Sequence, residues 1–185
     1  MIGDAGILNC FSENILATFT LTTKVFTVTL SSTLIESVKQ SKSIAIIGNG
    51  GNLAIANHVG SDMNRYLGKF TFYPDAVHLS ALSKDQPWHK PWIEYASQHA
   101  DLILGITTRA KSPIADALAS LPDDFDCYLF CPEQHPTVPT VLIDKDKCRR
   151  IDDRKEDLTF HEFEVEVLWQ FYMLFHECGA DLMTI

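Results

Sequence analysis

Three short, continuously apolar runs are spaced along the chain, and each is followed by a polar turn and a stretch with helical periodicity. The runs are Ser43–Ile47 (SIAII), Asp101–Ile106 (DLILGI) and Cys127–Cys131 (CYLFC). Strands that are apolar at every position are typical of a parallel sheet covered by helices on both faces. The sequence therefore predicts an α/β fold, a three-layer sandwich with a central parallel sheet of about five strands.

Two weaker apolar segments complete the predicted sheet. They are Ala76–Leu79 and Val138–Ile143, and Pro139 favours an edge position for the second, because proline cannot donate a ladder hydrogen bond. Helices are expected at residues 31–40, 52–66, 91–99, 113–121 and 159–178. Asn52 is the N-cap candidate of the second helix, and residues 144–157 are expected to form an exposed charged loop.

Length and charge limit the domain organisation and the partners. The 185 residues, 46% of them hydrophobic, predict a single domain over 1–185, with a helical N-terminal segment (1–40) and an α/β core with a C-terminal helix (41–185). The net charge of −9 argues against binding to nucleic acid or to an anionic membrane, since both need clustered cations.

Cysteine content and hydropathy favour a cytoplasmic protein. The number of cysteines, five, is odd, and they form no C-x-x-C pair, so reduced thiols are expected at Cys10, Cys127, Cys131, Cys148 and Cys178. The N-terminal segment lacks the basic region of a signal peptide. No apolar run reaches the roughly 18 residues of a membrane-spanning helix.

Two loops between a strand and a helix have the composition of anion-binding sites. The first, residues 48–52 (GNGGN), has glycines that permit a sharp turn and bring backbone N–H groups close to a ligand. The second, residues 105–112 (GITTRAKS), offers hydroxyls and two cations to a phosphate. Both follow strands, so both are expected at the carboxyl edge of the sheet, where ligands of open parallel sheets bind. Taken alone, the first is equally compatible with an ordinary turn.

The same segments carry a resemblance to a known family. IIGNGGNLAIANHVGSDM resembles the phosphoheptose isomerase segment in which a G-N-G-G-S turn precedes a helix with a His and, four residues later, a Glu. LILGITTRAKSPIADAL resembles that family's L-G-I-S-T-S-G-N-S phosphate loop, and Ser83-Lys84-Asp85 falls where the family has G-N-D. From about Ser31 to the last helix, the chain is thus similar to the SIS-domain sedoheptulose-7-phosphate isomerases.

This resemblance implies a bound sugar phosphate. The residues that it assigns to the substrate are Asn49, Gly50, Gly51, Asn52, Asp85, Thr107, Thr108 and Ser112. Arg109 and Lys111 are added to this set because their charge suits a phosphate. The chain departs from the family where S-G-N of the phosphate loop is replaced by residues 109–111 (RAK), so that the loop loses a glycine and a hydroxyl but gains two cations.

The resemblance also assigns the catalytic positions. The helix-borne His and Glu correspond to His58 and Asp62, which share one helix face. The family's C-terminal helix has a Gln and, eight residues later, a His, and these positions are assigned to His161 and Trp169. Asp62 and His161 are then the base and acid candidates of an aldose–ketose isomerase, with His58 beside them. The alternative is a non-catalytic SIS module that binds a phosphosugar or a protein, resembling the replication-initiator-associating protein.

A metal site is a further hypothesis. His58, Asp62 and His161 would make a two-His, one-carboxylate zinc site with an open position, supported by Glu162 or Glu164. The alternative is a surface or capping interaction within the His/Asp pair. No other cofactor is expected.

The resemblance implies three further properties: a homotetramer (or a homodimer) with active sites between subunits, a role in heptose synthesis for lipopolysaccharide or capsule, and helices near the N-terminus, where Phe19–Leu30 has strand propensity. Other aromatic residues are interpreted as structural. Surface or strand-end positions are predicted for His78, His89, His99, His135 and His176. Trp88 and Trp92 are predicted to pack in the core or between subunits. A core or interface stripe is predicted for Phe160, Phe163, Val167, Phe171, Leu174 and Phe175.

Overall fold

A single parallel sheet forms the centre of the protein. The computed structural model describes residues 30–75, 79, 87–143 and 160–182. The strands are β1 (Ser43–Gly48), β2 (Phe70–Phe72), β3 (Leu102–Ile106), β4 (Cys127–Cys131) and β5 (Thr140–Leu142). They pair in the order β2-β1-β3-β4-β5, and all four pairings are parallel. The prediction of a three-layer α/β sandwich with about five strands is confirmed.

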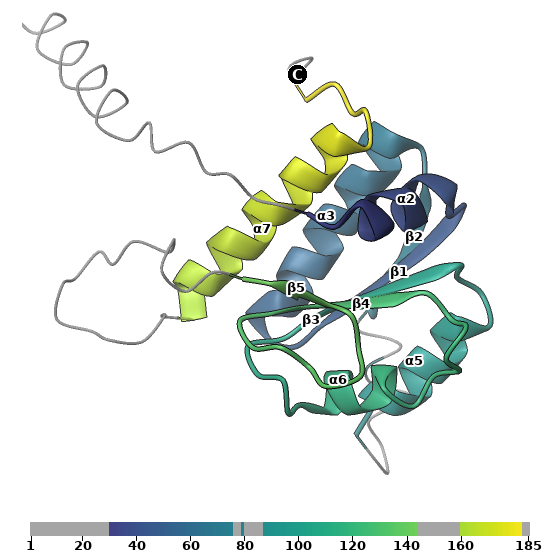
Figure 1. Cartoon of the computed structure of the whole chain (residues 1–185), viewed down its shortest axis with the longest axis vertical. Helices are drawn as coiled ribbons and strands as arrows, with labels where there is room; N and C mark the ends of the chain where they lie inside the picture. The colour runs from purple at the N-terminus through teal and green to yellow at the C-terminus, as the bar shows by residue number, and fades with distance from the viewer. Residues whose placement is uncertain (1–29, 76–78, 80–86, 144–159, 183–185) are drawn as a thin grey trace, which may run out of the picture.

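Helices cover both faces of this sheet (Figure 1). One face carries α2 (Ser32–Gln40), α3 (Gly51–Leu67) and α7 (Phe160–Glu177), and the other carries α5 (His89–Ser97) and α6 (Pro113–Leu118). Alternate residues of β1 serve the two faces, because successive side chains of a strand point in opposite directions. Ile44 and Ile46 join the core under α3 and α7, whereas Ala45 and Ile47 join the core under α5 and α6.

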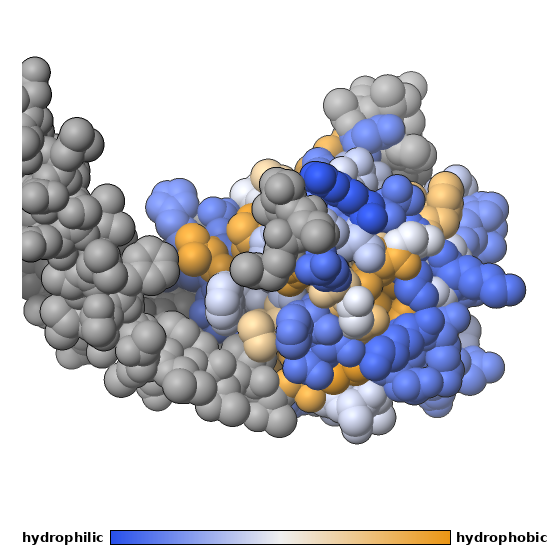
Figure 2. Space-filling view, turned by 90° about the horizontal axis from the view of Figure 1, so that it is seen from above, coloured by the Kyte–Doolittle hydropathy of each residue, from blue (hydrophilic) through white to orange (hydrophobic). Residues whose placement is uncertain are grey.

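Helix α7 also has an outward face. Val165 is 70% exposed and Trp169 is 46% exposed, and their i, i+4 spacing places them on the same side of the helix. Seen from above, the described surface mixes hydrophilic and hydrophobic residues (Figure 2). The exposed pair is separate from the stripe that covers the sheet, so α7 presents apolar side chains in two directions.

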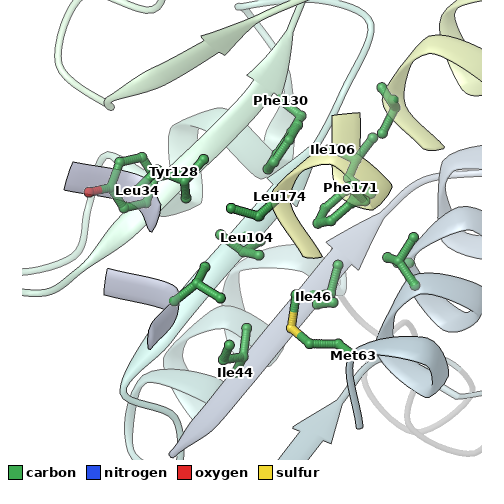
Figure 3. Packing of buried hydrophobic residues seen from close by; sticks show 14 of the residues in the cluster. Leu34, Ile44, Ile46, Met63, Leu104, Ile106, Tyr128, Phe130, Phe171 and Leu174 are labelled. Carbon is green, nitrogen blue, oxygen red and sulfur yellow. The ribbon is translucent and has the colours of Figure 1, made fainter. Parts of the chain in front are cut away.

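The inward face of α7 fixes it beside α3 over the sheet. Phe171 stacks on Phe130 of β4 with ring centroids 4.4 Å apart, and Met63 of α3 packs into the same cluster (Figure 3). The predicted stripe is core at five of its positions, namely Phe163, Val167, Phe171, Leu174 and Phe175. The side chain of Phe160 lies outside the described residues. Burial of these large side chains holds the two helices in a fixed relation.

Two local predictions are wrong. The second strand is β2 at Phe70–Phe72, not Ala76–Leu79; Leu79 is helical, and residues 76–78 lie outside the described ranges. A three-residue edge strand is too short to show a hydrophobic period. The N-cap of α3 is Gly50, not Asn52, because Gly50 has φ of 55° and turns the chain two residues earlier.

The other elements match their predictions with shifted ends. Helix α5 begins at His89 instead of Pro91, which occupies its first turn, where proline is tolerated. The predicted edge strand is confirmed as β5, and α6 ends at Leu118. The loop at 144–157 and the N-terminal segment before Leu30 lie outside the described residues.

The thiols and the helices agree with two further expectations. Cys127, Cys131 and Cys178 are thiols outside any disulfide, as predicted, while Cys10 and Cys148 fall outside the described ranges. Burial raises the pKa of the Cys127 thiol to about 11, so this thiol stays protonated at neutral pH. No helix in the described part of the chain is both long and apolar enough to span a bilayer.

Candidate functional site

The two predicted anion-binding loops start side by side. Gly48, the last residue of β1, is paired in register with Ile106, the last residue of β3. The turn that follows β1 and the loop that follows β3 therefore leave the same edge of the sheet at neighbouring positions. The predicted juxtaposition at the carboxyl edge is confirmed.

Close packing requires glycine in the first turn. A Cβ on Gly48 would lie 2.3 Å from the backbone oxygen of Asn52, so no other residue fits without moving the start of α3. The N–H of Asn52 donates to the carbonyl of Asn49 at 3.0 Å, and within the described part of the chain no side chain caps the N-terminus of α3. Asn52 itself is buried, and its Oδ1 has no hydrogen-bond partner among the described residues.

His89 closes this turn from the other face of the sheet. Its Nε2 lies 2.5 Å from Oδ1 of Asn49, and its ring stacks on Trp88 with centroids 4.2 Å apart. Burial lowers the pKa of His89 below its ordinary value, so the ring is neutral at pH 7. The predicted surface position is wrong for His89, because the helix that it begins faces the sheet edge. A lone histidine has no spacing signal that could have shown this.

Some of the remaining histidines and tryptophans are buried and others are exposed. His135 is also buried, contrary to prediction, because its Nδ1 accepts from the N–H of Val138 at 3.0 Å and shapes the loop before β5. His99 and His176 are exposed as predicted, and His78 lies outside the described residues. Trp92 is fully buried in the core, which confirms its packing role.

The second loop uses its own hydroxyls. Oγ1 of Thr107 lies 3.4 Å from the N–H of Arg109, and Oγ of Ser112 accepts from the N–H of Ala115 as the N-cap of α6. Thr108 is half-buried between them, and the side chains of Arg109 and Lys111 are exposed. The loop is thus ordered by internal contacts, and its two cations face solvent.

A carboxylate lies against this loop. Oε2 of Glu133 accepts from the N–H of Ala110 at 3.1 Å. Glu133 follows the end of β4, the neighbour of β3, and therefore reaches the same sheet edge. Sequence reasoning missed this contact, although the position of Glu133 just after a buried strand could have suggested it. An anion that used the N–H of Ala110 would have to displace this carboxylate.

The second group of predicted site residues lies between α3 and α7. Nε2 of His58 is 3.3 Å from Oδ2 of Asp62, and the Tyr172 hydroxyl donates to the same oxygen at 2.6 Å. That hydroxyl is also 3.0 Å from Nε2 of His58. Burial, with the hydrogen bond and the charge of Asp62, raises the pKa of Tyr172 to about 12, so its hydroxyl remains a donor at neutral pH.

His161 and Trp169 do not join this cluster within one chain. His161 lies in the first turn of α7, with its side chain 90% exposed and 3.4 Å from a Glu164 oxygen. About three helical turns, or roughly 16 Å, separate it from Tyr172. Trp169 lies on the outward face. Sequence reasoning missed Tyr172, although Glu164 and Tyr172 also have the eight-residue spacing of the family's Gln and His.

The hypothesised zinc ligands do not converge in one chain. Within the described residues, no three His, Cys, Asp or Glu side chains are grouped so that they could hold a metal ion. His58 and Asp62 are adjacent, but His161 is remote from them. Asp85, assigned to the substrate, lies outside the described residues. Zinc stays a prediction.

Comparisons with known proteins agree with this architecture. No known family model matches the chain. A curated phosphoheptose isomerase from Helicobacter hepaticus is 29% identical over 121 residues, which cover 57% of this chain and 62% of the relative. The match thus spans about three fifths of that relative's length. The solved phosphoheptose isomerase from Neisseria gonorrhoeae superposes with a TM-score of 0.58 at 13% identity, over 92% of this chain and 95% of that one.

The chain is a divergent relative of the phosphoheptose isomerases and has the SIS fold. The structure of the Vibrio vulnificus NanR protein complexed with ManNAc-6P is also similar to this chain. It has a TM-score of 0.54 and 17% identity, and the superposition covers 95% of this chain and 62% of that one. Proteins named as isomerases and a protein that is not named as one therefore share this fold.

Proposed function

We propose that this protein is a sugar-phosphate isomerase that interconverts an aldose and a ketose phosphate. The observation that carries the proposal is the contact of His58 and Asp62 on α3 with Tyr172 on α7. Helix α3 follows the glycine turn, and α7 packs beside it. A carboxylate, an imidazole and a phenol in mutual contact are groups that can move protons. The 29% identical relative named phosphoheptose isomerase supports the same activity.

The chemistry needs a base beside the carbon that loses its proton and an acid beside the carbonyl oxygen. In the proposed reaction, Asp62 takes the proton from the carbon next to the carbonyl, while His58 gives a proton to the carbonyl oxygen, and an enediol results. Return of the first proton to the neighbouring carbon, with loss of a proton from the other oxygen, gives the isomer. Tyr172 donates to Asp62 and holds its carboxylate in place.

One chain does not bring all of these groups to one sugar. The loops lie at the start of α3, whereas Asp62 lies about three helical turns, or roughly 16 Å, further along that helix. The proposal therefore includes an assembly in which the cluster of one copy faces the loops of another. The outward apolar pair Val165 and Trp169 supports such an assembly, and His161, exposed on the same helix, is retained as an acid candidate for a neighbouring copy.

The alternative is a protein that binds a phosphosugar without turning it over. The separation of roughly 16 Å between the loops and Asp62 favours it, because a single chain then has loops for a phosphosugar but no base beside them. A NanR structure complexed with ManNAc-6P has the same fold, so binding of a phosphosugar by this fold is compatible with a protein that is not named as an isomerase.

An isomerisation assay separates the two functions. Purified full chain would be incubated with sedoheptulose 7-phosphate, with and without added zinc, beside the Asp62→Asn variant and the control Asp124→Asn in an exposed loop. We expect turnover in the wild type and in the control, and a loss of at least about a hundredfold in Asp62→Asn. Absence of turnover in the wild type, with binding retained in calorimetry, would leave the binding module.

A further inference from the structure

Beside the glycine turn, two buried acceptor atoms have no hydrogen-bond partner among the described residues. Oδ1 of Asn52 and Nδ1 of His89 are both inaccessible to solvent and accept no hydrogen bond from the described residues. The residues are only 3% and 8% exposed. Buried polar atoms are almost always paired, because an unpaired one costs the free energy of its lost hydration. Two such atoms beside one turn indicate a missing donor.

The tautomer of His89 follows from its one polar contact. Oδ1 of Asn49 can only accept, so Nε2 of His89 must carry the proton and donate to it. A neutral imidazole has one donor and one acceptor nitrogen, and burial keeps this ring neutral. Nδ1 is therefore a lone-pair acceptor. Stacking on Trp88 holds the ring plane, so the direction of that lone pair is fixed.

Asn52 places the second acceptor against the same turn. A Cβ on Gly48 would lie 2.9 Å from Cβ of Asn52, so the two residues are in direct contact at the end of β1. The contact between His89 and Asn49 reaches this turn from α5. His89 and Asn52 thus contact the same turn from different helices.

The chemistry of the missing partner follows from the two acceptors. A phosphate dianion carries no hydrogen-bond donor, whereas every free hydroxyl of a sugar carries one. Acceptors alone therefore suit the polyol part of a sugar phosphate and not its phosphate group. The hydroxyl-rich loop after β3, with its exposed cations, has the complementary composition for the anion.

We propose that His89 is a substrate-binding and positioning residue, which holds Asn49 through Nε2–H and accepts a hydrogen bond from a sugar hydroxyl at Nδ1, while Asn52 accepts from a second hydroxyl. This inference rests on the proposed binding of a sugar phosphate. It adds a specificity element, since the site then distinguishes a polyhydroxylated ligand from inorganic phosphate.

Two variants of His89 separate its two contacts. In His89→Gln, the side-chain amide nitrogen can take the place of Nε2 and keep the bond to Asn49, but the acceptor at Nδ1 is lost. In His89→Asn, the side-chain oxygen can take the place of Nδ1, but the bond to Asn49 is lost. His99→Gln is the matched control, because His99 is exposed just beyond the C-terminal end of α5.

Calorimetry with sedoheptulose 7-phosphate and with inorganic phosphate tests the inference on the full chain. For His89→Gln we expect about three- to tenfold weaker binding of the sugar phosphate and a change under about twofold for phosphate, as for one lost hydrogen bond. His89→Asn should keep more of the sugar-phosphate affinity than His89→Gln.

Three results would overturn the inference. Unchanged sugar-phosphate affinity in a folded His89→Gln variant refutes the contact at Nδ1 and leaves the proposed function intact. Equal weakening for both ligands shows that His89 only supports the turn. If the wild type binds no sugar phosphate at all, the proposed function fails together with the inference.

Discussion

Removal of the Tyr172 hydroxyl tests whether the contact between α3 and α7 is organised around Asp62. The O–H···O distance of 2.6 Å is typical of a charge-assisted hydrogen bond, which contributes about 1.5–3 kcal/mol. Asp62 is 17% exposed, so water takes over part of the lost contact. We expect Tyr172→Phe to lower the free energy of unfolding by about 1.5 kcal/mol, which for a chain of this size is roughly 3–6 °C in Tm.

Chemical denaturation followed by circular dichroism would measure this change. Tyr66→Phe is the matched control, because Tyr66 packs beside the same helix pair, whereas the hydroxyl that donates to Asp62 is that of Tyr172. A double-mutant cycle with Asp62→Ala should give a coupling free energy of at least about 1 kcal/mol. Additive effects of the two substitutions would refute the argument that the hydroxyl acts through Asp62.

Three further perturbations address the loops and the buried histidine. Glu133→Gln should tighten phosphate binding about fivefold in low salt, because removal of one negative charge about 4 Å away in a solvated site contributes about 1 kcal/mol. Calorimetry checks this with Glu94→Gln as the control, and equal phosphate affinities of the two variants would contradict it. Gly48→Ala should lower the free energy of unfolding by about 1–3 kcal/mol through the clash with the start of α3, whereas a change below about 0.5 kcal/mol in urea denaturation would refute the close approach. Because the pKa of His89 is lower in the folded than in the unfolded protein, the unfolded state binds more protons below pH 6.5, so stability should fall as the pH drops from 6.5 towards the folded pKa. His89→Gln should show a flatter decline over that range, and parallel curves would rule out this contribution.

The layers and the two loops could be predicted because they depend on long, uniform signals. Strands β1, β3 and β4 are apolar along nearly their whole length, and each leads into a polar turn. This pattern predicted both the parallel arrangement of the strands and the position of the loops at the carboxyl edge of the sheet. Strand β2 was missed, since three residues at an edge carry no period. The N-cap of α3 was misplaced because the positive φ of Gly50 is a property of the folded turn.

The site itself was only half predictable. His58 and Asp62 have a helical spacing that the sequence displays, and the structure brings them together. Tyr172, His89 and Glu133 reach their partners from remote elements. The eight-residue spacing of Glu164 and Tyr172 and the place of Glu133 after β4 mark these positions, but neither pattern identifies the partner that the side chain contacts. Where a side chain points across a packed interface depends on helix rotation, which a sequence pattern fixes only to within a face.

Because Glu133 already occupies the N–H of Ala110, a phosphate that used this N–H would have to replace its carboxylate. A phosphate that takes the N–H of Ala110 releases a side chain that then needs water, so the measured affinity is a difference between two associations. The same loop would therefore look weak in a direct titration even if its intrinsic hold on phosphate were strong. Without ligand, Glu133 occupies the N–H of Ala110, and a sugar phosphate that took this N–H would release Glu133 to solvent as a local marker of occupancy.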